Sequence, residues 1–327
     1  MKKTIFSAIL CLCLLLVLVP LAARAETATV DVIADYGAAG DGVTDDRAAI
    51  QKAIDEAHAA GGGTVVLTAG KTFLSGNIVL RSNVELRFGE GAVLKQNPDE
   101  NAYVKPSGDT LVSYVPSRGH NTISGVRWGH SFYKNYPFVY AGEGSTNVKI
   151  TGAGTIEMTP ETACADTIHL CPVGFYRVDN FVISDITITK SSAYGMMPFT
   201  CTNGLIQNVT MKDFYSKNVD GSEHLNGDGI SMQNCQNIRV TGCNLTVTDD
   251  AIYIFTSYAD PRGGAWWSSD EPQPSKNIEI DHNICLTPLQ RLRLHSVGLL
   301  LPGSKPGGGQ QCLHPRQQLL LHGHLER

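Results

Sequence analysis

Two short stretches of the sequence carry residues that could do chemistry. Asp228 is followed by Gly-Ile-Ser-Met, and the pair formed by Asp249 and Asp250 is followed by Ala-Ile-Tyr-Ile. In each stretch, carboxylates run directly into alternating apolar residues, which is the pattern of a half-buried strand. Aligning the two strands residue by residue places Asp228 in register with Asp250, which lies 22 residues later.

A repeat of about 22 residues corresponds to one turn of a parallel β-helix, in which strands stack along one axis. Neighbouring strands in such a stack lie roughly 4.8 Å apart, so Asp228 and Asp250 would form a stacked carboxylate pair with Asp249 beside them. Carboxylates packed this closely shift one another's proton affinities. We therefore predict that the three acids form a site on one solvent-facing ladder, although an Asp-rich turn region is the alternative.

Three clustered carboxylates have two main chemical uses. In glycoside hydrolysis, one acid protonates the leaving oxygen while a carboxylate opposite activates water. In a lyase, the carboxylates bind Ca²⁺, which takes several oxygen ligands. The sequence favours hydrolysis because no lysine or arginine accompanies the trio as a base. A calcium-dependent polysaccharide lyase and a non-catalytic carbohydrate-binding β-helix protein remain as alternatives.

A recurring phrase indicates the scaffold that would position these acids. It consists of an asparagine, two further residues and a branched aliphatic residue, and one interval between successive asparagines is 23 residues. Stacked asparagines at a tight bend can bond to the backbone and to one another, so we assign them to the scaffold. Continuous helical periodicity is absent after residue 60, which argues against an α/β barrel. The phrase begins at Asn83, Asn147, Asn180, Asn203, Asn237 and Asn277.

One amphipathic helix is expected before the strands. Ile50, Ala53, Ile54 and Ala57 repeat at helical spacing on one face. Thr44 or Asp45 would supply the N-cap, and the glycines at 61–63 would end the helix. Such a helix can cover the open end of a solenoid core, since terminal repeats need a polar outer face.

The first 25 residues have the features of a secretory signal peptide. A basic start at Lys2 and Lys3 precedes an apolar run over residues 5–21, and Ala23-Arg24-Ala25 forms a cleavage pattern. The run is short for a membrane span, so we expect no membrane anchor and a secreted or periplasmic location. The net charge of −5 gives no electrostatic case for binding nucleic acid.

The remaining sequence divides into two parts. Residues 26–286 are long enough for one large domain, and 33 glycines in the whole chain with 7% aromatic residues suit a turn-rich all-β protein. Residues 287–327 lack both the asparagine phrase and the alternation of strands and turns. A region that no longer follows the pattern of the preceding sequence in any respect is not expected to belong to the same folding unit. We hypothesise a reading-frame shift near residue 288 that leaves the β-helix incomplete at its C-terminus; a native disordered tail is the alternative.

Two segments and four cysteines leave alternatives open. Residues 98–140 and 257–275 break the period, and insertions in solenoids emerge as loops, often on the binding face. The tryptophans in the second segment could stack on sugar rings or cap the core. The close cysteine pairs could be disulfides in an oxidising compartment, or buried thiols inside the solenoid. These residues are Trp266 with Trp267, Cys164 with Cys171, and Cys235 with Cys243.

At these residues the chain resembles the family 28 glycoside hydrolases, the polygalacturonases and their relatives. The family's Asn-Thr-Asp motif corresponds to Asn226-Gly227-Asp228, with glycine in place of threonine, and its paired aspartates correspond to Asp249 and Asp250. Residues 40–46 resemble a capping segment that is shared with other pectin-acting β-helix proteins. The resemblance extends from the start of the mature chain to about residue 286.

The resemblance implies a right-handed, single-stranded parallel β-helix and an inverting mechanism without a metal or other cofactor. Asp249 would be the general acid, while Asp228 and Asp250 would hold and deprotonate the attacking water. An inverting pair needs about 6.5–9.5 Å between its carboxyl groups. Strict strand alternation would point residues 249 and 250 to opposite faces, so we predict a bend or bulge at Thr248 and Asp249.

The implied substrate is a pectin-like polysaccharide. Asn226, Trp266 and Trp267 are the candidate substrate-binding residues. The family's Gly-His-Gly and Arg-Ile-Lys motifs do not occur, so binding of an acidic sugar is not implied, and His282 and His295 receive no role. We expect a monomer when the β-helix is complete, and little or no activity from the chain as it stands.

Overall fold

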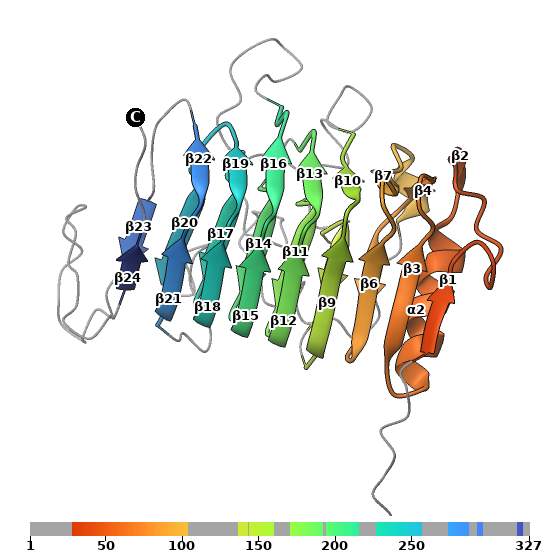
Figure 1. Ribbon diagram of the computed structural model, residues 1–327, viewed down its shortest axis with the longest axis horizontal. Coiled ribbons are helices and arrows are strands. Elements are labelled where there is room, and N and C mark those ends of the chain that lie inside the picture. Colours follow the sequence, from red (N-terminus) through yellow and green to blue (C-terminus); the bar gives the residue numbers. More distant parts are fainter. Residues whose placement is uncertain are drawn as a thin grey trace, which may run out of the picture.

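Parallel strands make up most of the regular structure in the part of the chain that the computed structural model describes (Figure 1). The described residues are 28–103, 137–142, 144–159, 171–191, 194–215, 227–256, 274–287, 293–296 and 319–322. Within them, the helical elements are α2 (Arg47–Ala59) and the 3₁₀-helix η1 (Glu100–Ala102). The absence of continuous helical periodicity after residue 60 therefore predicted the fold class correctly.

The strands form three parallel sheets. The nine-stranded sheet contains β1 (Ala28–Asp31), β3 (Gly63–Leu67), β6 (Val84–Phe88), β9 (Thr146–Gly152), β12 (Asp179–Ser184), β15 (Thr202–Gln207), β18 (Gln236–Thr241), β21 (Lys276–Asp281) and β24 (Leu319–His322). The eight-stranded sheet contains β2 (Asp41–Asp45), β4 (Thr72–Ser75), β7 (Val93–Gln96), β10 (Thr155–Glu157), β13 (Thr187–Thr189), β16 (Thr210–Lys212), β19 (Asn244–Thr246) and β22 (Ile284–Leu286). The seven-stranded sheet contains β5 (Ile78–Leu80), β8 (Val139–Ala141), β11 (Val173–Tyr176), β14 (Met196–Phe199), β17 (Ile230–Gln233), β20 (Ile252–Thr256) and β23 (Arg293–Ser296).

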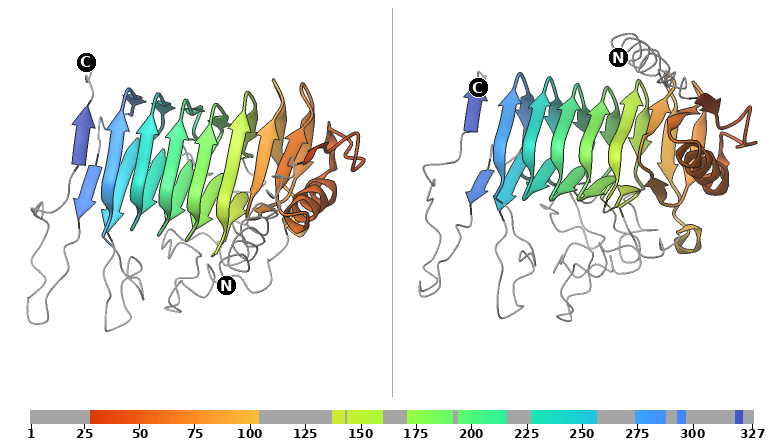
Figure 2. Two further views of the ribbon diagram at one scale, coloured as in Figure 1. Left: turned by 60° about the horizontal axis from the view of Figure 1, so that its bottom comes forward. Right: turned by 90° about the horizontal axis from the view of Figure 1, so that it is seen from below.

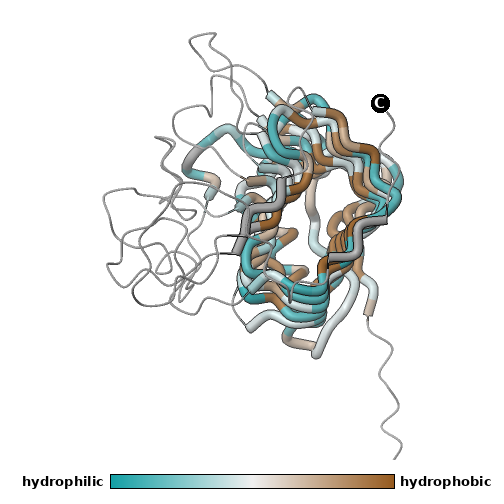
Figure 3. The backbone as a smooth tube through the Cα atoms, turned by 90° about the vertical axis from the view of Figure 1, so that its left-hand side faces the viewer, coloured by the Kyte–Doolittle hydropathy of each residue, from teal (hydrophilic) through white to brown (hydrophobic). Residues whose placement is uncertain are grey.

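The chain visits the three sheets in turn, so strands that neighbour each other in a sheet are one turn apart in sequence. The turn that carries β18, β19 and β20 is one example. β12 and β15 pair directly, which confirms that the 23-residue interval between Asn180 and Asn203 is a single turn. Figure 3 looks along the stack and shows successive coils superimposed around a common interior. The fold is a parallel β-helix, as the sequence predicted.

The interior is built from ladders of apolar side chains, one residue from each turn. One ladder in the seven-stranded sheet is 1% exposed or less at every position. Burying a large aliphatic side chain contributes about 1.5–3 kcal/mol to the stability of the fold, so the ladder residue of each turn stabilises the stack by a similar amount. The ladder runs through Ile78, Val139, Val173, Met196, Ile230 and Ile252.

The asparagines of the repeated phrase form a second, polar ladder. Each has a positive φ, between 53° and 63°, a left-handed conformation that asparagine adopts more readily than most residues. Side-chain amides bridge consecutive turns, for example from Asn237 to Asn203 at 3.0 Å and from Asn277 to Asn237 at 2.8 Å. At Asn203 the acceptor is instead the carboxylate of Asp179, at 2.7 Å. The structure thus confirms that these asparagines belong to the scaffold.

Helix α2 lies at the N-terminal end of the stack (Figure 2) and packs against β3, β5 and β6. Its buried residues are Ile50, Ala53 and Ile54, as the helical spacing predicted. The predicted N-cap was wrong, because residues 44 and 45 belong to β2 and the N-cap is Asp46. The Asp46 carboxylate instead accepts hydrogen bonds from the amides at positions 39 and 40, at 2.6 and 3.0 Å, which ties the preceding loop to the helix.

Five cysteines lie in the described part of the chain, and all are free thiols. Cys235 and Cys243 are buried and unbonded to each other, so the disulfide alternative for this pair is wrong and the buried-thiol alternative holds. Cys171 is also buried and free, and its predicted partner, Cys164, lies outside the described residues.

Two short strands lie within the segment predicted to be an aberrant tail. β23 pairs with β20, and β24 pairs with β21, both in parallel. The frame shift near residue 288 stays a prediction. Most of the two predicted loop segments lies outside the described residues, at 104–136 and 257–273. No helix in the described ranges has the length and apolar character needed to cross a membrane.

Candidate functional site

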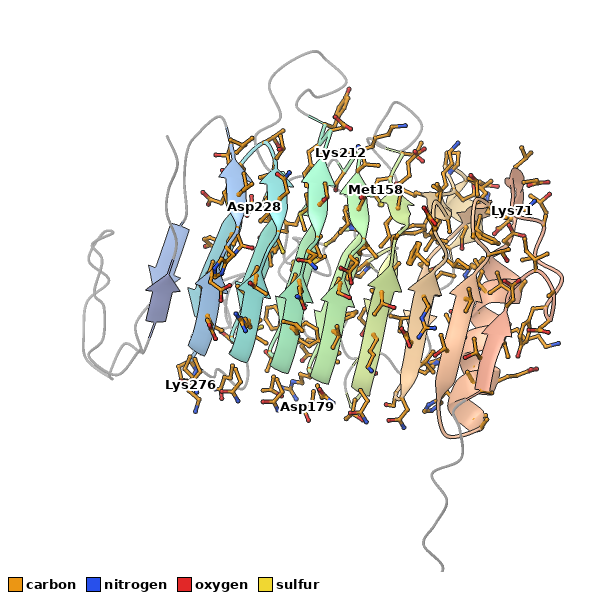
Figure 4. The ribbon with its side chains drawn as sticks, viewed as in Figure 1. Lys71, Met158, Asp179, Lys212, Asp228 and Lys276 are labelled. Atoms are coloured by element: carbon orange, nitrogen blue, oxygen red, sulfur yellow. The ribbon has the colours of Figure 1, made fainter. Side chains whose placement is uncertain are left out.

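The two aspartate-bearing stretches lie on adjacent turns in the predicted register. Ile230 pairs with Ile252, and Met232 pairs with Ile254. Directly before these strands, the Gly229 amide donates a hydrogen bond to the Asp250 carbonyl at 2.8 Å. Asp228 and Asp250 therefore occupy the same position on consecutive turns, and Asp228 lies in the C-terminal half of the stack (Figure 4). This confirms the register inferred from the sequence.

The chain bends at Thr248 and Asp249, as predicted. The amides of both residues donate to one acceptor, the Gly227 carbonyl, at 3.1 and 3.2 Å. In an extended strand, successive residues face opposite sides, so two consecutive amides that share one carbonyl require a bend at this point. The backbone accordingly bends at both residues. The bend removes the strict alternation that would have separated Asp249 and Asp250.

The prediction of a solvent-facing carboxylate ladder was wrong for two of the three acids. Asp228 is 6% exposed and Asp250 is 4% exposed, whereas Asp249 is half-buried. A buried carboxylate requires hydrogen-bond donors, and one donor to Asp228 Oδ2 is the Ser231 hydroxyl at 3.1 Å.

A tyrosine that sequence reasoning missed belongs to the same column. The Gly195 amide donates to the Asp228 carbonyl at 2.8 Å, and Met196 pairs with Ile230. Tyr194 therefore takes, one turn earlier, the position that Asp228 takes on its own turn. The spacing obscured this relation, because Tyr194 and Asp228 are 34 residues apart rather than 22. An alignment of Met196 with Ile230 as inward residues could have found it.

The environment of Tyr194 keeps its phenol protonated. Desolvation raises the pKa of Tyr194 well above its ordinary value of 10.0, and the charges of Asp228 and Asp249 raise it further. Tyr253 and Cys171 also contribute to this rise. A neutral phenol next to two carboxylates can donate a hydrogen bond. Tyr194 is half-buried, so this donor lies at the margin of the site.

Cys171 lies before β11, where the pairing of Val173 with Met196 aligns it with Tyr194. Burial raises the pKa of the Cys171 thiol to about 12. A thiol with such a pKa carries almost no thiolate at neutral pH, so it is a poor nucleophile. Cys171 is therefore not a candidate nucleophile.

Three of the predicted site residues cannot be compared with the structure. Asn226, Trp266 and Trp267 lie outside the described residues. Across the residues that the structure does describe, no three or more histidine, cysteine, aspartate or glutamate side chains gather in an arrangement that could hold a metal ion. The described part of the site consists of Tyr194, Asp228 with Ser231, and the pair Asp249 and Asp250.

The fold is that of a parallel β-helix protein, and comparisons with known proteins show which family of β-helix proteins it is. The chain belongs to the family described as rhamnogalacturonase A/epimerase, pectate lyase-like, whose model matches residues 30–248. The matched range includes Asp228 and ends directly before Asp249.

Two curated relatives match most of the chain. The exo-poly-alpha-D-galacturonosidase of Dickeya chrysanthemi is 26% identical over 315 residues, which cover 85% of this chain and 48% of that protein. A probable polygalacturonase of Vitis vinifera is 27% identical over 305 residues, which cover 89% of this chain and 54% of that protein. The chain thus spans about half the length of these two relatives.

Two further matches are a short sequence alignment and a structural superposition. Mannuronan C5-epimerase AlgE1 of Azotobacter vinelandii is 54% identical over only 61 residues, which cover 16% of this chain and 4% of that protein. A hyperthermoactive exopolygalacturonase of Thermotoga maritima has a solved structure that superposes with a TM-score of 0.58. Its identity is 24%, and the superposition covers 80% of this chain and 60% of that one. This likeness supports the fold.

Proposed function

We propose that this protein is a glycoside hydrolase that cleaves a pectin-like polysaccharide with inversion at the anomeric carbon. The observation that carries the proposal is the stacking of Asp228 on Asp250, with the bend at Asp249 beside them. Inversion needs an acid and a base that act from different directions, and Asp249 differs from the other two acids in being half-buried rather than buried.

The three acids then have distinct roles. Asp249 is the general acid, because it is the most exposed of the three and can approach a leaving oxygen from the solvent side. Asp228 and Asp250 hold and deprotonate the attacking water from their buried positions. Ser231 orients Asp228 by donating its hydroxyl hydrogen to Oδ2. Tyr194 donates its phenolic hydrogen to the sugar next to the scissile bond.

The likeness to polygalacturonases supports a pectic substrate. The partner is therefore a polysaccharide, and the protein acts as a secreted or periplasmic monomer. Cleavage of a polymer too large to enter a cell is consistent with the predicted signal peptide at residues 1–25, which lies outside the described residues.

The test is to incubate the full chain with polygalacturonate and with other pectic polysaccharides, and to measure new reducing ends. We expect slow release that Asp228→Asn abolishes, together with an inverted anomer in the nuclear magnetic resonance spectrum of the first product. Ultraviolet absorbance from an unsaturated sugar would instead identify the calcium-dependent lyase. Polysaccharide binding without any turnover would identify the non-catalytic carbohydrate-binding protein.

A further inference from the structure

Gly227 is the residue at which the sequence departs from the Asn-Thr-Asp pattern, and its surroundings explain the departure. A Cβ atom added to Gly227 would lie 2.3 Å from Thr248 Oγ1. Contacts this short do not occur between real side chains, so a larger residue at 227 would displace Thr248 or be displaced by it. The φ angle of Gly227 is outside the left-handed region. Glycine is therefore required by the threonine on the next turn and not by backbone conformation.

This contact joins the two carboxylate clusters directly. Gly227 precedes Asp228, and Thr248 precedes Asp249. The Gly227 carbonyl also accepts the amide hydrogens of Thr248 and Asp249, at 3.1 and 3.2 Å. Two backbone hydrogen bonds thus join the two turns where the acids emerge, and the Thr248 hydroxyl lies against the position that a Cβ at residue 227 would occupy.

Thr248 acts in this contact through its volume. Its side chain is 7% exposed, and Oγ1 has no hydrogen-bond partner among the residues that the structure describes. Phe214 closes the space from a third side, with Cδ2 at 3.4 Å from the same Cβ position. The space that a side chain at 227 would occupy is therefore filled from the following turn by Thr248.

We propose that Gly227 and Thr248 are paired positioning residues that set the separation between Asp228 and the Asp249–Asp250 pair. This inference rests on the proposed function. Its consequence is that the two positions are coupled: a side chain at 227 is compatible with a working site only when residue 248 is small. A shift of about 1 Å in a catalytic group can reduce the rate about a hundredfold, so this contact should control kcat more than substrate affinity.

The experiment is a set of variants at both positions, assayed for kcat, KM and the midpoint of thermal unfolding on the full chain. The variants are Gly227→Ala, Thr248→Ala, the double variant Gly227→Ala/Thr248→Ala, and the matched double variant Gly227→Ala/Thr248→Val. Valine keeps a methyl group where Oγ1 stands, so it preserves the contact while removing the hydroxyl. Thr246→Ala, on the exposed face of β19, is the control for loss of a threonine elsewhere.

We expect Gly227→Ala to lower kcat roughly ten- to hundredfold with little change in KM. Adding Thr248→Ala should restore kcat to within about threefold of wild type, and adding Thr248→Val should not, because interacting neighbours are not additive. Thr248→Ala alone should also lower kcat, through the empty space it leaves, and Gly227→Ala in that background should raise it. This reciprocal comparison holds even where Gly227→Ala alone fails to fold.

Two results would overturn the inference while leaving the proposed function intact. One is an active wild type in which the Ala and Val double variants behave alike. The other is a pair of single variants whose effects on kcat simply add. A wild type with no aspartate-dependent cleavage of any pectic polysaccharide would instead refute the proposed function, and this inference with it.

Discussion

The hydroxyl of Ser231 donates a hydrogen bond to Asp228 Oδ2 at 3.1 Å, and both residues are 6% exposed. A carboxylate that is removed from water depends on such donors, because a hydrogen bond to a charged group contributes about 1.5–3 kcal/mol. Ser231 is therefore part of what allows Asp228 to remain at a buried position next to two other acids.

Replacing Ser231 tests this relationship. Ser231→Ala should lower the free energy of unfolding by about 1–3 kcal/mol and reduce kcat, because Asp228 loses a donor that orients it. Urea unfolding and reducing-end release measure the two effects. The control is Ser75→Ala, since the buried Ser75 hydroxyl donates to a neutral carbonyl at 2.8 Å. An equal loss of kcat in both variants would contradict a specific role for Ser231.

The three aspartates should respond differently to the leaving group. Asp249→Asn should slow substrates with poor leaving groups most, because good leaving groups need little protonation. Asp228→Asn and Asp250→Asn should slow all substrates alike, since both acids act on water. Rates on aryl glycosides of graded leaving-group acidity would reveal the difference. Wild-type activity of Asp249→Asn on polymer, with the fold intact, would exclude Asp249 as the acid.

The same variants also have a predicted effect on stability. Because Asp228 and Asp250 are buried on consecutive turns, their like charges disfavour the folded state. Asp228→Asn and Asp250→Asn should therefore unfold at the same temperature as wild type or higher, while activity falls. A marked drop in the unfolding midpoint would show that these carboxylates serve the scaffold instead.

Much of the architecture could be predicted because it repeats. The asparagine phrase marks every turn from Asn83 to Asn277, and the apolar alternation after Asp228 and Asp250 aligns their two turns. Both signals arise from local rules, namely left-handed bends and inward-facing aliphatic residues. The bend at Thr248 followed from the same rules, since two adjacent acids could not otherwise reach one site.

The burial of Asp228 and Asp250 could not be predicted, because burial depends on which segments pack together in three dimensions and not on local pattern. Tyr194 was missed because an unequal turn length hides its register with Asp228. The N-cap was misplaced because the Asp46 carboxylate bonds to amides of the preceding loop, which hydrophobic spacing in the helix does not reveal. Each of these failed predictions concerns a contact between segments whose relative positions the sequence pattern does not show.

Asn237 offers a direct test of the polar ladder. It donates to Asn203 at 3.0 Å and accepts from Asn277 at 2.8 Å, with φ at 56°. Asn237→Gly loses both hydrogen bonds but keeps the conformation, whereas Asn237→Ala also incurs the left-handed strain of about 1–2 kcal/mol. The free energy of unfolding in urea should therefore be highest for wild type, lower for the glycine variant and lowest for the alanine variant. Equal losses would mean that strain is absent at this bend.

The position of Tyr194 in the same column as Asp228 implies a role in substrate binding. Tyr194→Phe removes the phenolic donor and keeps the ring, so we expect a fall in kcat/KM of roughly ten- to hundredfold, as for a lost hydrogen bond to a polar or charged group. Tyr140→Phe is the matched control, since Tyr140 is fully buried in β8 of the same sheet. Similar losses in both variants would contradict a role for Tyr194 in substrate binding.

Alkaline stability supplies a second, activity-independent test of Tyr194. Its pKa is raised in the folded protein, by burial first and by Asp228 and Asp249 next, so the folded state holds the phenolic proton at a pH where the unfolded state has released it. Stability from this group is complete below the ordinary pKa of 10.0 and is lost as the pH rises from there toward the folded pKa. Urea unfolding measured from about pH 9 to about pH 11, which brackets tyrosine ionisation, should show a shallower decline in stability for Tyr194→Phe than for wild type. Burial also raises the pKa of Cys243, to about 11, but this thiol is common to both proteins and its contribution cancels in the difference. Identical slopes for the two proteins would show that Tyr194 ionises freely and does not face the buried acids.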